Sequence, residues 1–304
     1  MNNSEILFLY DAVLCNPNGD IDEENQPRMD RETNRNLVSD VRLKRYIRDY
    51  LLGKGYEIFV AELEGKTVDA TTRLEEFCRK YGLLSQKENL QNALKDDEKR
   101  KQIFEKVLDQ MFDVRVFGAV IPIKPGEERA GQQETFTGPV QFNWGYSLNP
   151  VTINLSSSIT SIFAGRTRGE GEQYGTIGKD WRVFYSLIAF HGIVSAKRGK
   201  ITRLKEEDIF ILDDALLKSI PVEATTRSKV GQFPRLLLRV EYKDDETFLG
   251  DLRPYLKIRP NEGIDLEKIR TVEDYELEVS PLLELLKDNE DRINRFFVWQ
   301  HNSL

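Results

Sequence analysis

Short apolar runs alternate along the chain with polar segments that carry glycine and proline. The run 6–14 is rich in apolar and aromatic residues, and its length favours a buried, central strand. The turn Asn16-Pro17-Asn18-Gly19-Asp20 ends this strand, because proline fixes φ and Asn-Gly tolerates positive φ. Similar composition predicts further strands over 56–63, 114–121 (a strand or a turn), 140–163, 181–196 and 235–242.

The spacing of apolar residues after this turn predicts the first helix. Leu43, Ile47, Tyr50 and Leu51 lie at positions i, i+4, i+7 and i+8, so they form one buried stripe. Ser39 is the expected N-cap, and two glycines shortly after the stripe end the helix. We expect the cations of this helix to fall away from the stripe; they are Arg42, Lys44, Arg45 and Arg48.

Two segments interrupt the alternation of strands and helices. Residues 64 to about 112 are amphipathic and free of proline, which predicts a helical insertion. Residues 165–180 carry five glycines between two strand-like runs. Without these segments, and with a second helix over 204–220, the order is strand, helix, strand, strand, helix, strand. This βαββαβ order predicts an α+β protein with a ferredoxin-like or RNA-recognition-like sheet.

Composition excludes several classes of protein. The 304 residues are 39% hydrophobic, enough for a packed core, and 31% charged. Neither a signal peptide nor a membrane span is recognisable, and two cysteines make no disulfide framework, so we expect a cytoplasmic protein. The cysteines and the two histidines are scattered along the chain, which argues against structural zinc. We predict no metal and no cofactor.

Charge is distributed unevenly along the chain. The net charge of -7 taken alone argues against a nucleic-acid binder. Residues 28–54, however, hold eight Lys/Arg against four Asp/Glu, and residues 166–205 hold nine against three. Residues 262–292 hold eleven acids against four bases, which equals the excess of the whole chain. Because charges more than about 10 Å apart are largely screened, local patches steer a polyanion and the global sum does not.

Three interpretations of the basic helix stay open on these grounds. Such a helix face is often simply solvated. It can also dock on an acidic face of another protein, as in an interaction scaffold. Finally, it can hold a polyanion by its phosphates, and the glycine-rich segment with its flanking arginines and lysine favours this third interpretation.

Enzymatic interpretations have weaker support. Gly178-Lys179 resembles the end of a phosphate-binding loop, but Gln173 and Asp180 stand where that motif requires Gly and Ser/Thr. A metal-dependent ribonuclease that uses loop aspartates such as Asp20 or Asp30 is the remaining enzymatic alternative. Neither histidine is close to these aspartates in sequence.

Five motifs in a fixed order make the chain similar to one known family. They are Asn16–Asp20, Ser39–Arg48, Val114–Gly118, Gly138–Gln141 and Thr226–Lys229. Together they resemble the Cas-seven family, the backbone subunit of type I CRISPR interference complexes (Cascade), and most closely its subtype I-B branch, the Csh-two group. The resemblance covers residues 5 to about 243.

This resemblance implies an architecture like a right hand, with an RNA-recognition-like palm, inserted helical fingers and a thumb hairpin. The implied boundaries are 1–63 for the first part of the palm, 64–140 for the fingers insertion, 141–160 for a palm strand region, 161–182 for the thumb hairpin, 183–243 for the second part of the palm, and 244–304 for an acidic C-terminal segment packing on the palm.

The resemblance also implies where RNA is bound. Palm contacts map onto Ser39, Arg42, Lys44, Arg45 and Arg48, and a further RNA-facing loop maps onto Thr226, Arg227 and Lys229. Phe117 and Gly118, with Val120 nearby, match a loop beside a displaced base. The thumb contributes Arg166, Arg168 and Lys179, with Tyr174 as the main candidate for the residue that displaces the base.

What the resemblance implies about function is a non-catalytic subunit that binds CRISPR RNA (crRNA). Copies of the chain stack head to tail along the guide, so an acidic face and a basic face on one subunit suit a filament. The implied partners are crRNA, the target DNA strand paired to it, further copies of the chain, and the other Cascade subunits (Cas-five, Cas-six, and the large and small subunits). The implied role is antiviral defence.

Overall fold

One antiparallel sheet organises the described part of the chain. The computed structural model describes residues 1–61, 69–123, 132–155, 158–161 and 176–302. Its eight-stranded sheet has the order β16-β13-β1-β12-β9-β5-β4, and β8 also pairs with β12. The strands are β1 (Ser4–Cys15), β4 (Met29–Asp30), β5 (Arg35–Val38), β8 (Val140–Phe142), β9 (Gly145–Ser147), β12 (Val183–Val194), β13 (Gln232–Tyr242) and β16 (Ile293–Gln300).

Strand β1 lies in the interior of this sheet, as its composition predicts. Phe8 pairs with Phe190 of β12 on one side and with Leu237 of β13 on the other. Successive side chains of a strand point to opposite faces, so Phe8 enters one apolar cluster and Leu7 enters the other. Both side chains are fully buried, which explains why the run is apolar on both faces, with the exception of the buried Asp11, which pairs with Arg235.

Two helices cover the first face of the sheet. They are α1 (Asp40–Gly53) and α7 (Glu206–Glu223), and both contribute to the cluster that contains Phe8. The predicted stripe of α1 is buried in this cluster, and the predicted bounds of both helices are close to the observed ones. A short helix that the sequence did not predict, α6 (Ala196–Thr202), connects β12 to α7. Among the described residues, no helix is both long enough and apolar enough to cross a bilayer.

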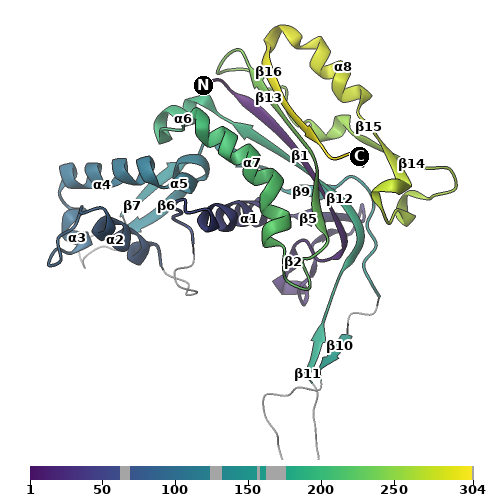
Figure 1. Ribbon diagram of the computed structural model, residues 1–304, viewed down its shortest axis with the longest axis horizontal. Coiled ribbons are helices and arrows are strands. Elements are labelled where there is room, and N and C mark those ends of the chain that lie inside the picture. Colours follow the sequence, from purple (N-terminus) through teal and green to yellow (C-terminus); the bar gives the residue numbers. More distant parts are fainter. Residues whose placement is uncertain (62–68, 124–131, 156–157, 162–175, 303–304) are drawn as a thin grey trace, which may run out of the picture.

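The C-terminal segment covers the second face of the sheet (Figure 1). It contains the hairpin of β14 (Lys257–Pro260) and β15 (Tyr275–Glu278), then α8 (Ser280–Asp288), and β16 then returns to pair with β13. Five single-turn 3-10 helices lie in the described residues: η1 (Ile21–Glu23), η2 (Arg253–Tyr255), η3 (Leu266–Lys268), η4 (Val272–Asp274) and η5 (Glu290–Arg292).

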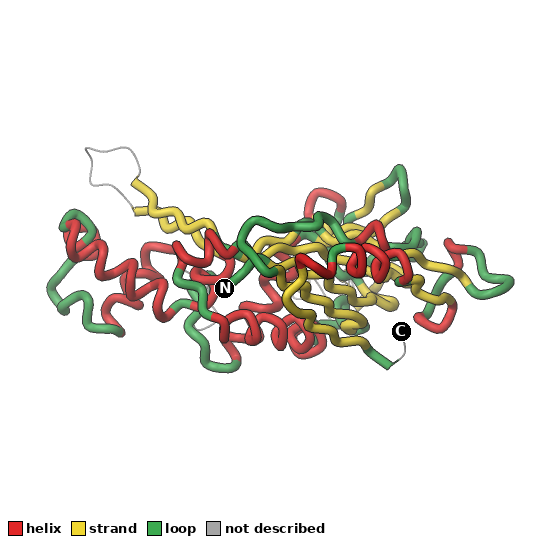
Figure 2. The backbone as a smooth tube through the Cα atoms, turned by 90° about the horizontal axis from the view of Figure 1, so that it is seen from above, coloured by secondary structure: helices red, strands yellow, loops and turns green. Residues whose placement is uncertain are grey.

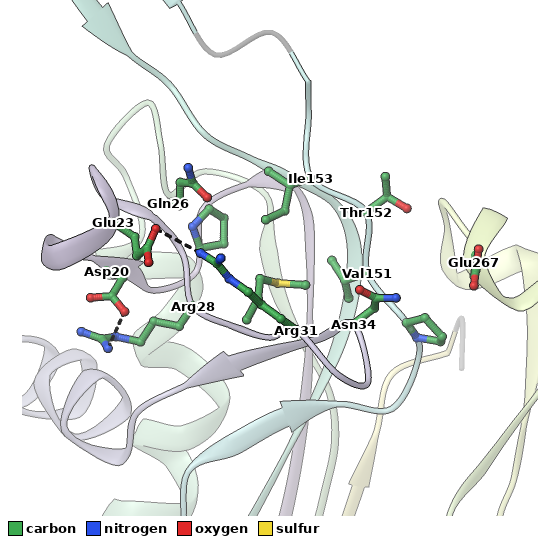
Figure 3. A pocket seen from close by; sticks show the side chains of 13 residues that line it. Asp20, Glu23, Gln26, Arg28, Arg31, Asn34, Val151, Thr152, Ile153 and Glu267 are labelled. Carbon is green, nitrogen blue, oxygen red and sulfur yellow. Dashed lines mark hydrogen bonds and ion pairs between the residues drawn. The ribbon is translucent and has the colours of Figure 1, made fainter.

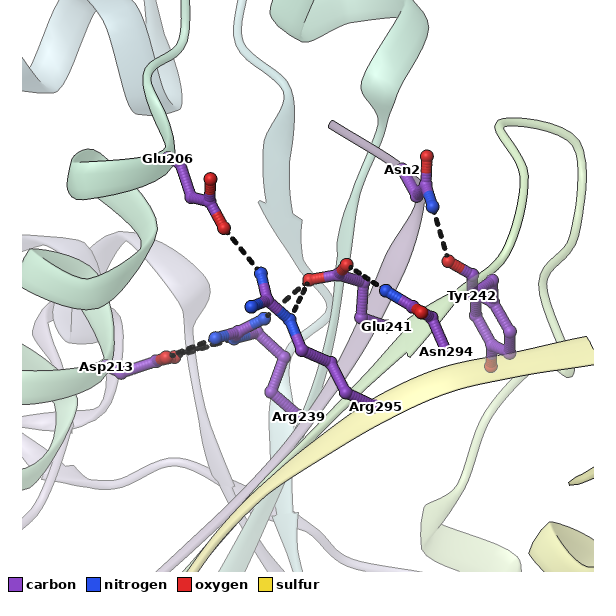
Figure 4. Close-up of polar contacts among 8 residues, drawn as sticks. All are labelled: Asn2, Glu206, Asp213, Arg239, Glu241, Tyr242, Asn294 and Arg295. Atoms are coloured by element: carbon purple, nitrogen blue, oxygen red, sulfur yellow. Dashed lines mark hydrogen bonds and ion pairs between the residues drawn. The ribbon is translucent and has the colours of Figure 1, made fainter.

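A chain of ion pairs ties α7 to β13 and β16 (Figure 4). The buried Arg239 of β13 lies 2.8 Å from Asp213 of α7 and 3.7 Å from Glu241. Arg295 of β16 then bridges Glu241 and Glu206 at 2.9 and 2.6 Å. Because each charge has an opposite partner, this network fixes the edge of the sheet against the helix layer.

A group of helices with its own apolar cluster lies at one end of the molecule (Figure 2). It contains α2 (Ala70–Lys80), α3 (Leu90–Ala93), α4 (Asp97–Gln110) and α5 (Phe112–Phe117), followed by the hairpin of β6 (Gly118–Ile123) and β7 (Gln132–Thr137). The predicted helical character of this part of the chain is confirmed for α2, α3 and α4.

One predicted strand near this group is wrong, and a second is confirmed only in its latter half. The described part of 56–63 forms no strand and makes a single bridge, between Glu57 and Met111. Residues 114–117 belong to α5, and the strand begins only at Gly118. All six residues of α5 are buried. Asp113 and Arg115 alternate with apolar residues in this segment, so its pattern has the period of two that is typical of a strand, although the segment is helical.

A smaller hairpin extends away from the sheet (Figure 1). It consists of β10 (Ser158–Ser161) and β11 (Thr176–Lys179), which pair antiparallel. Three predicted RNA-binding residues, Arg166, Arg168 and Tyr174, lie outside the described residues. At the same end of the sheet, β2 (Gly19–Asp20) pairs with β3 (Gln26–Pro27). Cys15 and Cys78 are both free and buried.

Candidate nucleic-acid interface

The turn after β1 holds the start of α1 in place. The Asn18 side-chain oxygen accepts hydrogen bonds from the Ser39 backbone N–H at 2.9 Å and from the Ser39 hydroxyl at 3.0 Å. Ser39 is the N-cap residue, as predicted, but its hydroxyl bonds to Asn18 and not to the helix. The turn motif therefore positions the first turn of α1, and with it the cation at position 42.

Arg42 and Lys229 form a pair of cations, called the cationic pair below. The Arg42 guanidinium lies 4.0 Å from the centre of the Tyr46 ring, and its Nε is buried with no hydrogen-bond partner in the described residues. Lys229 Nζ donates to the Asn16 carbonyl at 2.6 Å. Within the described part of the chain, neither cation has an ion pair with a carboxylate.

The cationic pair has an electrostatic cost that an anion would relieve. Burial, together with the neighbouring Arg42 guanidinium, lowers the pKa of Lys229 to about 8. Both effects penalise the charged amine, since burial removes its water and Arg42 adds a like charge. A bound phosphate would supply opposite charge and hydrogen-bond acceptors to both side chains. The pair therefore has the chemistry of an anion site.

Two cations of α1 do not fall away from the core, and this corrects the prediction for Lys44 and Arg48. Lys44 is buried, and its Nζ donates to Asp40 at 3.0 Å and to Gln141 at 3.1 Å. Arg48 Nε donates to Asp113 at 2.9 Å, and that carboxylate is fully buried. Both side chains are turned toward α5 and β8 because a buried carboxylate and an amide there need donors.

Arg45 has an environment intermediate between that of the cationic pair and that of the buried cations Lys44 and Arg48. Its Nε donates to Asp49 at 2.7 Å, one turn further along α1, and its side chain is 41% exposed. Arg45 is therefore partly neutralised but accessible from solvent. Of the four predicted cations of α1, Arg42 and Arg45 remain candidates for direct contact with a polyanion.

The region around Phe117 packs behind α1. The Phe117 ring is buried and lies 5.7 Å from Lys44 Nζ and 5.4 Å from the Arg48 guanidinium, so it supports these cations. Gly118 has φ +79°, and a Cβ there would lie 2.1 Å from the Phe136 carbonyl oxygen. This position accepts glycine alone without rearrangement. Val120 is 55% exposed, so it is presented to solvent.

The loop 226–229 brings the second half of the cationic pair to α1. The Thr226 carbonyl accepts hydrogen bonds from the backbone N–H groups of Lys229 and Val230, at 2.8 and 3.0 Å. This turn leaves Thr226 and Arg227 exposed while the Lys229 side chain folds inward. In the β11 hairpin strand, Lys179 is exposed and lies 3.9 Å from Glu24.

Sequence reasoning missed three residues that organise this interface. Asn18 orders the helix start, Gln141 receives Lys44, and Arg182 links the hairpin to two loops. Asn18 and Gln141 stand inside two of the motifs, but a motif alone does not tell a supporting side chain from a contacting one. Arg182 stands among the cations that flank the glycine-rich segment, but the sequence does not show its role, because the carbonyls that it binds lie far away in the sequence.

Both loop aspartates are engaged in local contacts, and Asp20 lines a cavity of about 470 Å³ (Figure 3). Arg28 Nη1 donates to Asp20 at 2.9 Å. Asp30 accepts from the Thr33 hydroxyl and the Glu32 N–H, and these bonds lower the pKa of Asp30. Within the described residues, no group of three or more Asp, Glu, His or Cys side chains has an arrangement suited to a metal ion.

Fold and surface together define an α+β protein whose sheet supports a cationic pair built from two distant segments. Comparison with known proteins identifies the family. The family model "CRISPR-associated protein Cas7" matches residues 2–280. A curated "CRISPR-associated protein Cas7" from Haloferax volcanii is 33% identical over 310 aligned positions, which cover 98% of this chain and 86% of that protein. The chain belongs to the Cas7 family of CRISPR-associated proteins.

A solved structure supports the assignment at the level of fold. One chain titled "CRISPR RNA-guided surveillance complex, pre-nicking" has a TM-score of 0.50 and 13% identity to this chain. The match covers 84% of this chain and 79% of that one. At this identity the likeness concerns the fold alone. The α+β class predicted from the order of elements is confirmed.

Proposed function

We propose that this chain is a crRNA-binding backbone subunit of a type I-B Cascade complex, without catalytic activity of its own. The observation that carries the proposal is the cationic pair, in which Arg42 and Lys229 have no carboxylate partner within the described residues. Cations on a rigid helix and a short turn contact phosphates without reading bases. A subunit that serves any guide sequence requires this kind of contact, because base pairing supplies the specificity.

We also propose that the sheet is an RNA-recognition-like palm. The strand order β13-β1-β12-β9, with α1 and α7 on one face, supports this assignment, because it matches the βαββαβ arrangement of ferredoxin-like sheets. In this proposal β8 and β9 take the place of the strand that the sequence predicted over 56–63. The helices α2 to α4 then belong to the fingers, and β10 and β11 belong to the thumb.

The proposed direct contacts to the guide are the accessible members of the predicted set. They are Arg42, Arg45, Val120, Lys179, Thr226, Arg227 and Lys229, while the buried Gly118 is proposed to shape the loop beside them. Ser39, Lys44, Arg48 and Phe117 are proposed to act behind them, by holding α1 in position. Several copies follow the guide head to tail, and the target DNA strand and the other Cascade subunits are the further partners.

Recovery of bound RNA tests the proposal. The chain is expressed together with the other genes of its CRISPR operon and is purified. The bound RNA is then extracted and sequenced. We expect spacer-repeat molecules of one length, and we expect the Arg42→Ala, Lys229→Ala double variant to recover much less RNA while it stays folded. A complex free of nucleic acid would contradict the proposal and would favour an interaction scaffold that uses its basic face on protein.

The ribonuclease alternative has a separate test. The assembled complex is incubated with RNA complementary to the guide and with magnesium. We expect intact RNA, because Asp20 is paired with Arg28 and Asp30 is occupied by its own turn. Regularly spaced cuts that disappear in Asp30→Ala or Asp20→Ala would establish the alternative.

A further inference from the structure

We propose that Arg182 is a positioning residue that fixes the loop 226–229 relative to the β10–β11 hairpin. Its role in RNA binding rests on the proposed function, but its role in ordering the loop does not. Arg182 lies just after β11 and just before β12, where the hairpin joins the sheet. Its backbone holds the base of the hairpin, and its side chain reaches two loops that are far away in sequence.

The base of the hairpin is closed by Asn154 and Arg182. The Asn154 side-chain oxygen accepts from the Arg182 backbone N–H at 2.6 Å, and its amide nitrogen donates to the Asp180 carbonyl at 3.1 Å. The Asn154 backbone N–H in turn donates to the Arg182 carbonyl at 3.0 Å. These three bonds hold the two chain segments that lead into β10 and out of β11 side by side.

The guanidinium of Arg182 extends from this base toward two loops. Nη1 donates to the Leu14 carbonyl at 2.7 Å, and Nη2 donates to the Arg227 carbonyl at 3.2 Å. Nε and Nη2 also donate to the Asp180 carboxylate at 3.0 and 2.9 Å. Arginine is the side chain suited to this task, because its planar fork offers several donors in fixed directions.

The two carbonyls that Arg182 binds belong to the segments that surround Lys229, one member of the cationic pair. Leu14 precedes Asn16, whose carbonyl accepts from Lys229, and Asn16 N–H donates to the Ser228 carbonyl at 2.7 Å. Arg227 lies in the same turn as Lys229. The hairpin, the end of β1 and the cationic loop therefore meet at one guanidinium. Leu14 adopts φ +46°, a conformation costly for leucine, which this bond helps to hold.

The charge of Arg182 is used within the protein. Asp180 pairs with the guanidinium at 2.9 Å, and the two side chains are 24% and 13% exposed. We therefore infer that Arg182 acts on RNA through the loop and not by contacting a phosphate. This distinction is measurable, since each phosphate contact changes the dependence of affinity on salt.

The test compares the wild type with Arg182→Ala, Arg182→Lys and a matched control. The control is Arg259→Ala, because Arg259 also pairs with one carboxylate through two bonds, to Glu278 of a different hairpin. Hydrogen exchange is measured at the amides of residues 226–230. We expect faster exchange in Arg182→Ala, partial recovery in Arg182→Lys, and no change in the control. Unchanged exchange in Arg182→Ala would overturn the proposal.

RNA binding gives the second measurement, with a fluorescently labelled single-stranded RNA over a salt series. We expect Arg182→Ala to bind about tenfold more weakly, or ~1.4 kcal/mol, with the wild-type salt slope. A slope reduced by ~0.7 would instead show a direct phosphate contact, and unchanged affinity would show that loop order does not matter for binding. Both results overturn the proposal.

A further variant separates loop order from hairpin order. Asn154→Ala removes the two side-chain bonds that close the hairpin base, and it leaves the Asn154 backbone bond and both carbonyl contacts of the Arg182 guanidinium. We expect its loop amides to exchange as in the wild type. Faster exchange there would assign the ordering to the hairpin as a whole and contradict the role of Arg182. If wild-type protein binds no RNA, the proposed function fails, while the exchange data still test the loop.

Discussion

The cations on α1 and in the loop 226–229 include two sets that have different environments. Lys44 and Arg48 face the core and are paired with Asp40 and Asp113. The cationic pair has no such partners within the described residues, and Lys229 carries a depressed pKa. The first set is buried to hold α1 against α5 and β8, and the second keeps its charge for a ligand.

The comparison shows that counting cations in a sequence overestimates the charge available to a partner. A carboxylate within hydrogen-bond distance neutralises a lysine or arginine before any polyanion approaches. The charge that a cation can offer to a ligand depends on the burial of its carboxylate partner and on the number of its donors that remain without a hydrogen bond.

Breaking the buried pair of Arg48 and Asp113 has the largest expected effect. Arg48→Ala leaves a fully buried carboxylate without its cation, so we expect a loss of roughly 3–5 kcal/mol in the free energy of unfolding. Urea unfolding followed by circular dichroism measures this. The Phe59 and Val60 N–H groups still donate to Asp113, and they set the lower end of the range. A loss below 1 kcal/mol would show that the pair does not support the fold.

Removing one member of the cationic pair should weaken RNA binding and leave the fold intact. For Arg42→Ala or Lys229→Ala we expect a loss of roughly 1.5–3 kcal/mol in binding free energy, typical of a charged hydrogen bond. The salt slope should fall by ~0.7 for each variant, because one phosphate contact is lost. Lys44→Ala serves as the comparison, and its slope should stay at the wild-type value. Equal slopes in all variants would remove the distinction between the two sets.

The protonation of Lys229 gives a further test of the difference between the two sets of cations. Its pKa in the folded protein is about 8, below the ordinary 10.5, so the folded state releases this proton more readily than the unfolded chain. The charged lysine therefore lowers stability at neutral pH, and that penalty disappears as pH rises from about 8 to 10.5. RNA affinity should change in the opposite direction and fall as pH rises through about 8.

The control for this pH effect is Lys229→Arg. Arginine stays charged throughout the range, so the variant should lose the fall in RNA affinity near pH 8. Anisotropy titrations from neutral to alkaline pH at constant ionic strength measure both proteins. The same fall in wild type and variant would place the titrating group elsewhere.

The smallest expected effect belongs to Arg45. Its pair with Asp49 is exposed and one helical turn apart, so Arg45→Ala should cost only ~0.3–0.5 kcal/mol of stability. Urea unfolding measures this cost, as for Arg48→Ala, and the two residues can be compared directly because both lie on α1. A cost as large as that of Arg48→Ala would mean that burial does not separate the two residues.

The sequence predicted those parts of the fold whose pattern is local. The buried stripe of α1 and the apolar run of β1 both follow from spacing and length, and the structure confirms them. The strand over 56–63 and the orientation of Lys44 and Arg48 were wrong for a shared reason. Each depends on a distant partner: Met111 for Glu57, Gln141 for Lys44, and Asp113 for Arg48. No local pattern encodes such partners, and the same holds for Arg182.

The place of β1 inside the sheet has a consequence for synthesis on the ribosome. Ser4 pairs with Val194 on one side and with Glu241 on the other. Strand β1 therefore leaves the exit tunnel roughly 10–50 s before β13 is complete, at ~5–20 residues per second. During that time at least one edge of β1 has no partner strand. We therefore expect the nascent chain to depend on a chaperone or another transient cover, and truncation before β13 to produce an insoluble product.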